Sequence, residues 1–278
     1  MTTKSKTKLA IVAGHGELPV KLAQSVRSVG IEPLIFALNQ EIYQKLIADF
    51  EVHQFSPVEV SSMLELAKIK AIKDIAFIGK VPKLDFFKNI HRLDPELLSK
   101  IKDLSNLNDD SLHFRLLEFL EQEHGFNVID QTQYLRDYFP AEQTFTKRQI
   151  SSEELEEIQY GLKMAKEIAR LDIGQTVVVK NKAVIAVEAI EGTNKAIKRA
   201  AKSFGLFKDN RITVCKVSKP DQDNRFDVPT IGLETVKTMP RNSILAIEAG
   251  QTFFVDQKQA IELANKKNIL LCSIKVEY

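Results

Sequence analysis

The chain has 278 residues, of which 39 are Lys or Arg and 37 are Asp or Glu, so its formal net charge is +2. A chain of this length corresponds to about two domains and can bury an ordinary hydrophobic core. The nearly balanced charge excludes a protein that binds nucleic acid by bulk electrostatics. A hydrophobic content of 44% with 27% charged residues excludes general disorder.

The N-terminus and the two cysteines indicate a cytoplasmic protein. The apolar run Leu9–Ala13 is too short for the hydrophobic region of a signal peptide, and no run approaches the roughly 18 apolar residues of a membrane-spanning helix. Cys215 and Cys272 lie in apolar, strand-like runs, which predicts reduced core residues. Peripheral contact with the cytoplasmic face of a membrane is left open.

The first half of the chain alternates strand-like and helical patterns. This alternation predicts an α/β domain over residues 1–137, with a Rossmann-like, mostly parallel sheet and helices on both faces. The expected strands are Lys8–Ala13, Pro33–Ala37, Glu51–Phe55, Asp74–Ile78 and Phe126–Ile129. The expected helices are Pro19–Val29, Glu41–Ala48, one that begins at Ser56-Pro57 and runs to about Lys70, one opened by Asp94-Pro95, and Ser111–Glu123.

The pattern changes near Tyr138. Residues 138–150 contain a proline and little periodicity, so we expect a linker there, followed by a smaller α+β domain over 151–278. Ser151 and the acids after it predict the start of a long helix that reaches Arg170. The other expected elements are a hairpin of Gln175–Val179 and Ala183–Val187, helices Gly192–Ser203 and Asp256–Lys266, strands Arg211–Val217, Ser243–Ile247, Thr252–Val255 and Asn268–Ile274, and a polar loop Ser218–Gly232.

Two glycine motifs follow predicted strands of the first half. Gly14-His15-Gly16 opens a helix after the first strand, and Gly79-Lys80 follows the fourth. Glycine lets backbone N–H groups approach a phosphate, and Lys80 could meet one as a point charge. The dinucleotide-binding fingerprint is incomplete, because Pro19 stands where its third glycine belongs. A tight turn without a ligand remains the alternative for both motifs.

Two pairs of acids precede predicted helices. Asp109 and Asp110 could contact a ribose or a metal, or could only cap the helix that follows them. Glu188 and Glu191, next to Gly192-Thr193, could bind a hard cation or an Arg/Lys cluster, or could form a strand-end turn and a helix cap.

The polar loop carries the strongest chemical signal. It holds three carboxylates, two side-chain amides, an arginine and a lysine, with Pro220 and Pro229 near its ends. Oxygen ligands suit Mg²⁺, and the guanidinium fork of arginine suits phosphate. The loop therefore predicts metal-assisted displacement at phosphorus, with a solvated surface loop as the alternative. The residues that would carry this chemistry are Lys219, Gln222, Asp223, Arg225 and Asp227.

Other hydrolytic chemistries have no motif in this chain. The five histidines form no H-E-x-x-H pair, and neither C-x-x-C nor G-x-S-x-G occurs. A zincin, a dithiol oxidoreductase and a serine hydrolase with a nucleophile elbow are therefore disfavoured.

The motifs in this order resemble the LpxI-type UDP-2,3-diacylglucosamine pyrophosphatases of lipid A biosynthesis. The resemblance covers nearly the whole chain. It is carried by AIVAGHGELP at 10–19, FIGKV at 77–81, NDDSLHFRLLEFLEQEHGF at 108–126, RLDIGQTVVV at 170–179, VEAIEGT at 187–193 and KPDQDNRFDVPTIGLETV at 219–236.

The resemblance implies a Rossmann-like N-terminal domain, a C-terminal catalytic domain, and Mg²⁺-dependent hydrolysis of UDP-2,3-diacylglucosamine. The products would be UMP and 2,3-diacylglucosamine 1-phosphate (lipid X), after attack of water on the sugar-side phosphorus. The essential aspartate of the family falls on Asp227. The alternatives are a hydrolase of another nucleotide sugar and a non-catalytic nucleotide or lipid sensor, and a homodimer is left open.

Each motif thereby receives an expected role. Lys219, Gln222, Asp223, Arg225 and Asp227 are expected to be catalytic. The expected substrate contacts are Gly14, Gly16, Gly79, Lys80, Asp109, Asp110, Gly192 and Thr193. The expected Mg²⁺ ligands are Asp223, Asp227, Glu188 and Glu191.

Overall fold

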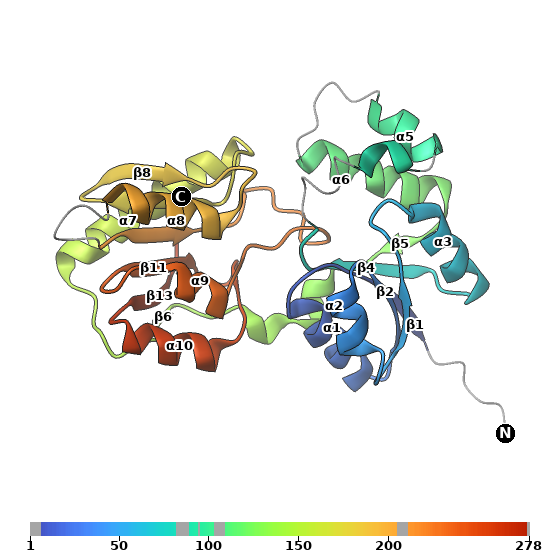
Figure 1. Cartoon of the computed structure of the whole chain (residues 1–278), viewed down its shortest axis with the longest axis horizontal. Coiled ribbons are helices and arrows are strands. Elements are labelled where there is room, and N and C mark those ends of the chain that lie inside the picture. Colours follow the sequence, from blue (N-terminus) through green and yellow to red (C-terminus); the bar gives the residue numbers. More distant parts are fainter. Residues whose placement is uncertain (1–6, 82–88, 94, 103–108, 205–210, 277–278) are drawn as a thin grey trace. The chain divides into compact units, whose positions relative to one another are not determined.

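The computed structural model describes residues 7–81, 89–93, 95–102, 109–204 and 211–276. The chain forms two compact units (Figure 1). Unit 1 comprises Met1–Arg136 and Asp223–Asp227, and unit 2 comprises Asp137–Gln222 and Val228–Tyr278. The chain therefore passes from one unit to the other three times. Lys219–Gly232, the charged part of the polar loop, is named the charged loop; five of its residues belong to unit 1 although both flanks belong to unit 2.

Unit 1 is built on a five-stranded, fully parallel sheet in the order β3-β2-β1-β4-β5. Its strands are β1 (Lys8–Ala13), β2 (Glu32–Ala37), β3 (Glu51–Gln54), β4 (Asp74–Ile78) and β5 (Asn127–Val128). The helices are α1 (Leu18–Ser28), α2 (Gln40–Leu46), α3 (Val60–Ile69), α5 (Pro95–Lys102) and α6 (Asp109–Leu117), with a π-helical stretch over Glu118–Glu123 and 3₁₀ turns at Ile90–Arg92, Gln131–Tyr134 and Arg136–Tyr138.

Both faces of this sheet are covered, which explains why its strands are apolar without alternation. Ala10 and Val12 of β1 belong to a core cluster with residues of α3, α5 and the π-helical stretch. Ile11 points to the other face, as strand geometry requires, and is fully buried. The buried residues of α1 and α2 supply further apolar surface. The expected α/β class is thus confirmed, although α3 begins at Val60 rather than at Pro57.

Unit 2 is built on a six-stranded mixed sheet in the order β6-β13-β11-β9-β7-β8. Strands β9, β11 and β13 are parallel, and β6, β7 and β8 pair antiparallel. The strands are β6 (Gln143–Thr144), β7 (Thr176–Lys180), β8 (Ala183–Val187), β9 (Thr213–Lys216), β11 (Ile244–Glu248) and β13 (Leu270–Ile274), with a separate parallel pair of β10 (Thr230–Ile231) and β12 (Phe253–Phe254). The helices are α7 (Ser152–Arg170), α8 (Thr193–Phe204), α9 (Leu233–Thr238) and α10 (Gln257–Lys266).

The two faces of this sheet bury separate cores. Residues of α7 pack with Val177, Cys215 and Ala246 on one face, and residues of α8, α9 and α10 pack with Val178 and Val214 on the other. Both cysteines are buried and free, which confirms that they are reduced core residues. Burial raises the pKa of Cys272 to about 12.

The segment expected as a linker, 138–150, is part of unit 2. Gln143 and Thr144 form β6, which pairs with Ser273 and Cys272 of β13. The sequence pattern gave no sign of a two-residue edge strand, because such a strand exists only through its partner. The same reason explains why β10 was absent from the expected elements.

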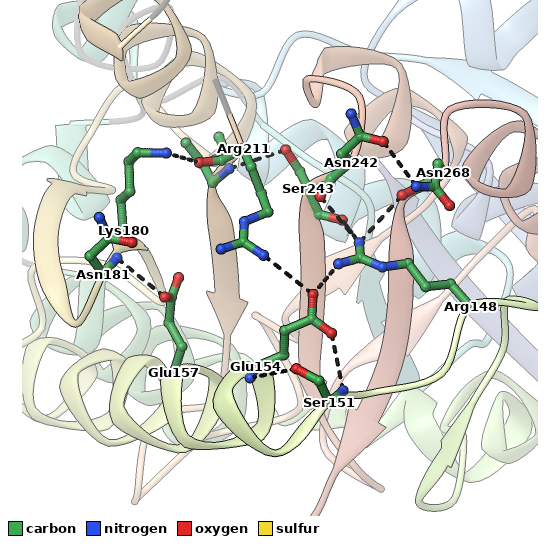
Figure 2. A network of polar contacts seen from close by, with 11 residues as sticks. Arg148, Ser151, Glu154, Glu157, Lys180, Asn181, Arg211, Asn242, Ser243 and Asn268 are labelled. Atoms are coloured by element: carbon green, nitrogen blue, oxygen red, sulfur yellow. Dashed lines mark hydrogen bonds and ion pairs between the residues drawn. The ribbon is translucent and has the colours of Figure 1, made fainter. Parts of the chain in front are cut away.

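An ionic network fixes the chain just after β6 (Figure 2). The guanidinium of Arg148 donates to the carbonyl oxygens of Asn242, Ser243 and Asn268 at 3.1, 3.4 and 3.4 Å. It also pairs with Glu154 on the first turn of α7. The entry to α7 is thereby tied to the amino ends of β11 and β13.

Glu154 is the centre of this network. Its carboxylate pairs with Arg148 and lies 3.5 Å from Nη1 of Arg211, and it accepts the backbone N–H of Ser151 at 3.1 Å. The Ser151 hydroxyl in turn accepts the N–H of Glu154, which completes a capping box. The predicted start of the long helix is confirmed.

Within the described residues, no helix combines the length and the low charge that a bilayer span requires.

Candidate active site

The turns that follow β1 and β4 are joined by backbone hydrogen bonds. The N–H of Gly14 donates to the carbonyl of Ile78 at 2.8 Å, and His15 and Lys80 exchange N–H···O bonds of 2.8 and 2.9 Å. A Cβ on Gly14 would lie 2.7 Å from the Lys80 carbonyl oxygen, and one on Gly79 would lie 2.8 Å from that of Gly14. Both glycines are needed because the two turns approach each other so closely.

This pairing changes the interpretation of the first glycine motif. The amides of Gly14, His15 and Lys80 donate to protein carbonyls. At Gly14 and Gly79, another stretch of backbone therefore makes the close approach that glycine permits. This supports the alternative that these two glycines form tight turns without a ligand. Gly16, with φ +107 just before α1, and the Lys80 side chain keep their predicted role as substrate contacts.

The predicted contact at Asp109 and Asp110 falls at the edge of the described region. Helix α6 begins at Asp109. The side chains of both aspartates, and residues 103–108 before them, lie outside the described residues, as does the expected cap Asp94. Their role as substrate contacts stays a prediction.

The beginning of the charged loop is fixed within unit 2. The ammonium of Lys219 pairs with the carboxylate of Asp172, and only 10% of the Lys219 side chain is exposed. The side-chain oxygen of Gln222 accepts the N–H of Lys219 at 3.2 Å and the side-chain amide of Gln175 at 3.0 Å. Lys219 and Gln222, both expected to act in catalysis, are held by residues from the turn between α7 and β7.

The next five residues, Asp223–Asp227, belong to unit 1 and form a compact turn. Asp223 accepts the backbone N–H of Arg225 at 3.0 Å, and its two oxygens accept Nε and Nη2 of the same arginine at 2.9 and 2.8 Å. These hydrogen bonds raise the pKa of Arg225 above its ordinary value. Both Asp223 oxygens therefore have a cationic partner, which disfavours Asp223 as a Mg²⁺ ligand.

The turn is attached to the rest of unit 1 through three neighbours. The ring of Phe226 packs against Phe77 of β4, with 5.1 Å between ring centroids. The side-chain amide of Gln131 donates to the carbonyl of Asn224 at 2.6 Å. Nη1 of Arg225 lies 3.6 Å from the Glu121 carboxylate. Asp227 follows Phe226 directly and is partly exposed.

Glu188 lies in a second ionic network, in unit 2. Its carboxylate accepts the Thr193 hydroxyl at 2.9 Å and lies 3.5 Å from the ammonium of Lys216. Lys216 also donates to the hydroxyls of Thr193 and Thr176 at 2.8 and 3.4 Å. Burial alone raises the pKa of Glu188, but the Lys216 charge and the hydroxyl hydrogen bonds outweigh it, so the pKa lies below its ordinary value.

Glu191 has a different setting from Glu188. It pairs with Arg199 of α8 at 2.7 Å and accepts the N–H of Ala189 at 3.2 Å, which closes the turn before the helix. Gly192 follows with φ +85. This geometry supports the turn-and-cap alternative. Thr193 orients a carboxylate in this geometry, so its predicted contact with substrate stays a prediction.

A third network lies where β9 and β11 end. Lys166 of α7 and Glu248 of β11 are both buried, with 2.7 Å between Nζ and Oε2. Glu248 accepts the backbone N–H and the hydroxyl of Ser218 at 2.8 and 3.0 Å, and Lys166 donates to the Ser218 carbonyl at 3.0 Å. Ser218 directly precedes the charged loop, so this buried pair fixes the point where the loop departs from the sheet.

The local sequence pattern did not single out these supporting residues. They are charged or hydroxyl side chains at positions that the local pattern makes apolar or ordinary: Lys166, Asp172, Thr176, Lys216, Ser218 and Glu248. A signal existed for three of them. Lys166 falls on the apolar face of α7, and Lys216 and Glu248 end apolar strand runs. Charged residues seldom occupy buried positions unless they are paired.

The carboxylates that the structure describes do not assemble a complete metal site. Among the described residues, no group of three or more His, Cys, Asp or Glu side chains could hold a metal ion. Glu188 and Glu191 each face a cation, which disfavours both as Mg²⁺ ligands. Mg²⁺ needs only one or two carboxylates when phosphate oxygens and water supply the rest.

Comparison with known proteins covers both units. Residues 8–138 match the model of the LpxI N-terminal domain, and residues 141–272 match that of the LpxI C-terminal domain. The chain belongs to the LpxI family. It is 30% identical over 284 residues to the UDP-2,3-diacylglucosamine pyrophosphatase LpxI of Caulobacter vibrioides, an alignment that covers 96% of this chain and 97% of the relative.

The two LpxI models meet close to the passage from unit 1 to unit 2 at Asp137. Residues 223–227, however, lie within the C-terminal LpxI model and pack in unit 1. Apart from residues 137–138 at the passage itself, the division of the family into two sequence domains therefore differs from the spatial division of this chain only at the candidate catalytic turn.

Proposed function

We propose that this chain hydrolyses the pyrophosphate bond of UDP-2,3-diacylglucosamine to UMP and 2,3-diacylglucosamine 1-phosphate. The observation that carries the proposal is the match along 96% of the chain to a relative named for this substrate. The charged turn 223–227 supports it, because Arg225 and Asp227 lie two residues apart in it.

In the proposed reaction, a water oxygen attacks the sugar-side phosphorus. The bond from that phosphorus to the bridging oxygen breaks, and UMP leaves with the bridging oxygen. Asp227 accepts the proton of the attacking water and orients it. Arg225, which Asp223 holds in one orientation, stabilises the negative charge that develops on the phosphoryl oxygens.

Mg²⁺ is part of the proposal. Asp227 would hold it together with oxygens of the substrate, and the ion would neutralise charge on the phosphoryl group. Lys219 and Gln222 position the beginning of the loop through Asp172 and Gln175.

The test uses purified protein with UDP-2,3-diacylglucosamine, in Mg²⁺ or in EDTA. We expect UMP and lipid X in Mg²⁺ only. Asp227→Asn should lower kcat about 1000-fold or more, because it removes the proton acceptor and the metal ligand together. Asp221→Asn is the matched control, since Asp221 is an exposed aspartate of the same loop. Hydrolysis in ¹⁸O-water should place the label in the sugar phosphate.

Other outcomes would favour the other functions. Equal turnover of a nucleotide sugar without acyl chains would indicate a different hydrolase. Tight binding without turnover in any divalent cation would indicate a sensor. Label in UMP would place the attack on the other phosphorus.

We also propose that the chain contacts an anionic lipid surface through α8. Lys195, Lys198 and Lys202 recur at helical spacing on its exposed side, next to Arg199, which pairs with Glu191. Helix α8 itself contains no acidic residue. Ile190, which is 57% exposed, lies in the turn that leads into the helix. A basic stripe beside an exposed apolar side chain suits anionic headgroups, and the proposed substrate is itself a lipid.

Co-sedimentation with anionic vesicles tests this contact. Lys198→Glu/Lys202→Glu should abolish binding, whereas Lys258→Glu/Lys266→Glu on α10 makes the same charge change elsewhere and should not. Equal loss in both double variants, or equal binding to zwitterionic vesicles, would refute the assignment to α8.

A further inference from the structure

We infer that Phe226 is a positioning residue that keeps Arg225 and Asp227 in place by docking the turn 223–227 into the core of unit 1. The inference rests on the proposed function in assigning chemistry to Arg225 and Asp227. The docking itself rests on contacts within unit 1.

The Phe226 ring is the apolar anchor of the turn. It packs with the buried core that contains Ala10, Val12 and Phe119, and its centroid lies 5.1 Å from that of Phe77 at an interplanar angle of 40°. Phe77 lies in β4, one of the two central neighbours of the parallel sheet around β1. Through Phe226, the turn is therefore attached to a strand of the central sheet.

Gln131 provides a polar anchor beside the ring. It is only 1% exposed, and its amide donates to the carbonyl of Asn224 at 2.6 Å. Its own side-chain oxygen has no hydrogen-bond partner among the described residues. Burying an incompletely satisfied amide is unfavourable, so the position is explained by the bond that Gln131 makes to the turn.

The turn transmits the position of the ring to both charged side chains. The carbonyl of Asp223 accepts hydrogen bonds from the N–H groups of Phe226 and Asp227 at 3.4 Å each. The Asp223 carboxylate accepts hydrogen bonds from Nε and Nη2 of Arg225. Arg225 and Asp227 are the immediate chain neighbours of Phe226. Loss of the ring would therefore release both charged groups at once.

The residues on either side make this anchor necessary. Gln222 before the turn and Val228 after it belong to unit 2. Lys219 and Gln222 fix the loop to unit 2 only up to the point where it crosses. Contacts within unit 1 therefore hold residues 223–227. Phe226 has the largest apolar side chain of the five residues, so we expect it to contribute most to this binding.

The experiment compares Phe226→Ala and Phe226→Leu with Phe55→Ala. Phe55 is a matched control, because it is also a partly buried aromatic residue packed on the same core, beside Phe36 at 5.4 Å. Phe226→Ala should lower kcat about 100-fold, as expected when catalytic groups are misplaced by about 1 Å, while KM changes little. Phe226→Leu should restore most of kcat, and Phe55→Ala should keep it.

Limited proteolysis tests the docking without any assay of activity. Arg225 is the only tryptic site between Pro220 and Gly232, and Lys219 is protected because proline follows it. Cleavage after Arg225, identified by mass spectrometry, therefore reports release of the turn. It should be at least about 10-fold faster in Phe226→Ala than in the wild type, and unchanged in Phe55→Ala, because cleavage follows the open population.

The two readouts separate the possible failures. A wild type that does not hydrolyse the lipid nucleotide would remove the proposed function but would leave the tryptic comparison valid. Equal cleavage of Phe226→Ala and wild type would overturn the docking. Equal kcat in Phe226→Ala and Phe55→Ala, with an active wild type, would overturn the positioning role.

Discussion

Ion pairs lie at both ends of the unit 2 sheet, but the two ends use them differently. At the amino ends of β9 and β11, Arg148 and Arg211 meet at Glu154, and Arg148 also binds backbone carbonyls (Figure 2). At the carboxyl ends, Lys166 meets Glu248, and Lys216 meets Glu188. The pairs at the amino ends attach chain segments to the sheet, and the pairs at the carboxyl ends lie where the charged loop leaves the sheet.

The choice of cation fits this difference. Arginine has a planar fork of five donors that can satisfy several carbonyls and a carboxylate together, as Arg148 does. Lysine brings a compact charge that suits a small buried pocket, as at Lys166 and Ser218. We expect the pairs at the amino ends to stabilise the fold, and those at the carboxyl ends to stabilise it and to present the loop as well.

Breaking the buried pair at the carboxyl end should have the largest effect. Lys166→Met leaves the Glu248 carboxylate buried without its cation, so the free energy of unfolding should fall by about 3–5 kcal/mol in chemical denaturation. The double variant Lys166→Met/Glu248→Met should recover most of that loss. We expect its kcat to stay low because Ser218 has lost its acceptor. Full activity in the double variant would contradict a role in presenting the loop.

Glu154→Gln should weaken the ionic network at the amino ends of β9 and β11 without affecting activity. It removes the charge that both arginines share but keeps the shape, so unfolding should require about 1–3 kcal/mol less. Turnover measured well below the melting temperature should equal that of the wild type. A fall in kcat at such a temperature would show that the two ends are coupled.

Asp172→Asn should release the beginning of the charged loop from the turn between α7 and β7. The pair with Lys219 is largely buried, with 10% of the Lys219 side chain and 16% of the Asp172 side chain exposed. Removing its anion should therefore lower the free energy of unfolding by about 1–3 kcal/mol, and kcat should fall about 10-fold because the loop loses its charged tether. Glu167→Gln is the control, since Glu167 makes an exposed pair with Arg170 near the same end of α7. Equal kinetics of both variants would refute the tether.

The smallest predicted effect is on the pH dependence of stability. The pKa of Glu188 is lower in the folded protein than its ordinary value of 4.5, so its contribution is fully present above that pH. The contribution is lost as the pH falls through the folded pKa. Thermal melts of wild type and Glu188→Gln should therefore converge as the pH is lowered below about 4.5. A constant difference in melting temperature across that range would contradict the assignment.

The sequence was sufficient for the elements whose signals are local. The apolar run of β1, the capping box at Ser151 and the hairpin of β7 and β8 were predicted and are confirmed, because each depends on residues close together in the chain. The charged loop was also predicted, because its charged residues follow one another in the sequence. The LpxI relationship was also recognisable from motifs of this kind.

Only the tertiary structure decided which contacts these segments make. Gly14 and Gly79 meet because β1 and β4 are neighbours in the sheet, and Lys166 meets Glu248 because α7 packs over β9 and β11. The assignment of residues 223–227 to unit 1 depends on Phe226 finding Phe77 and on Asn224 finding Gln131. Such pairings arise from burial of distant segments against each other, and no local pattern encodes them. The sequence alone therefore determined the elements and the chemistry of the loop, and packing determined where the loop is held.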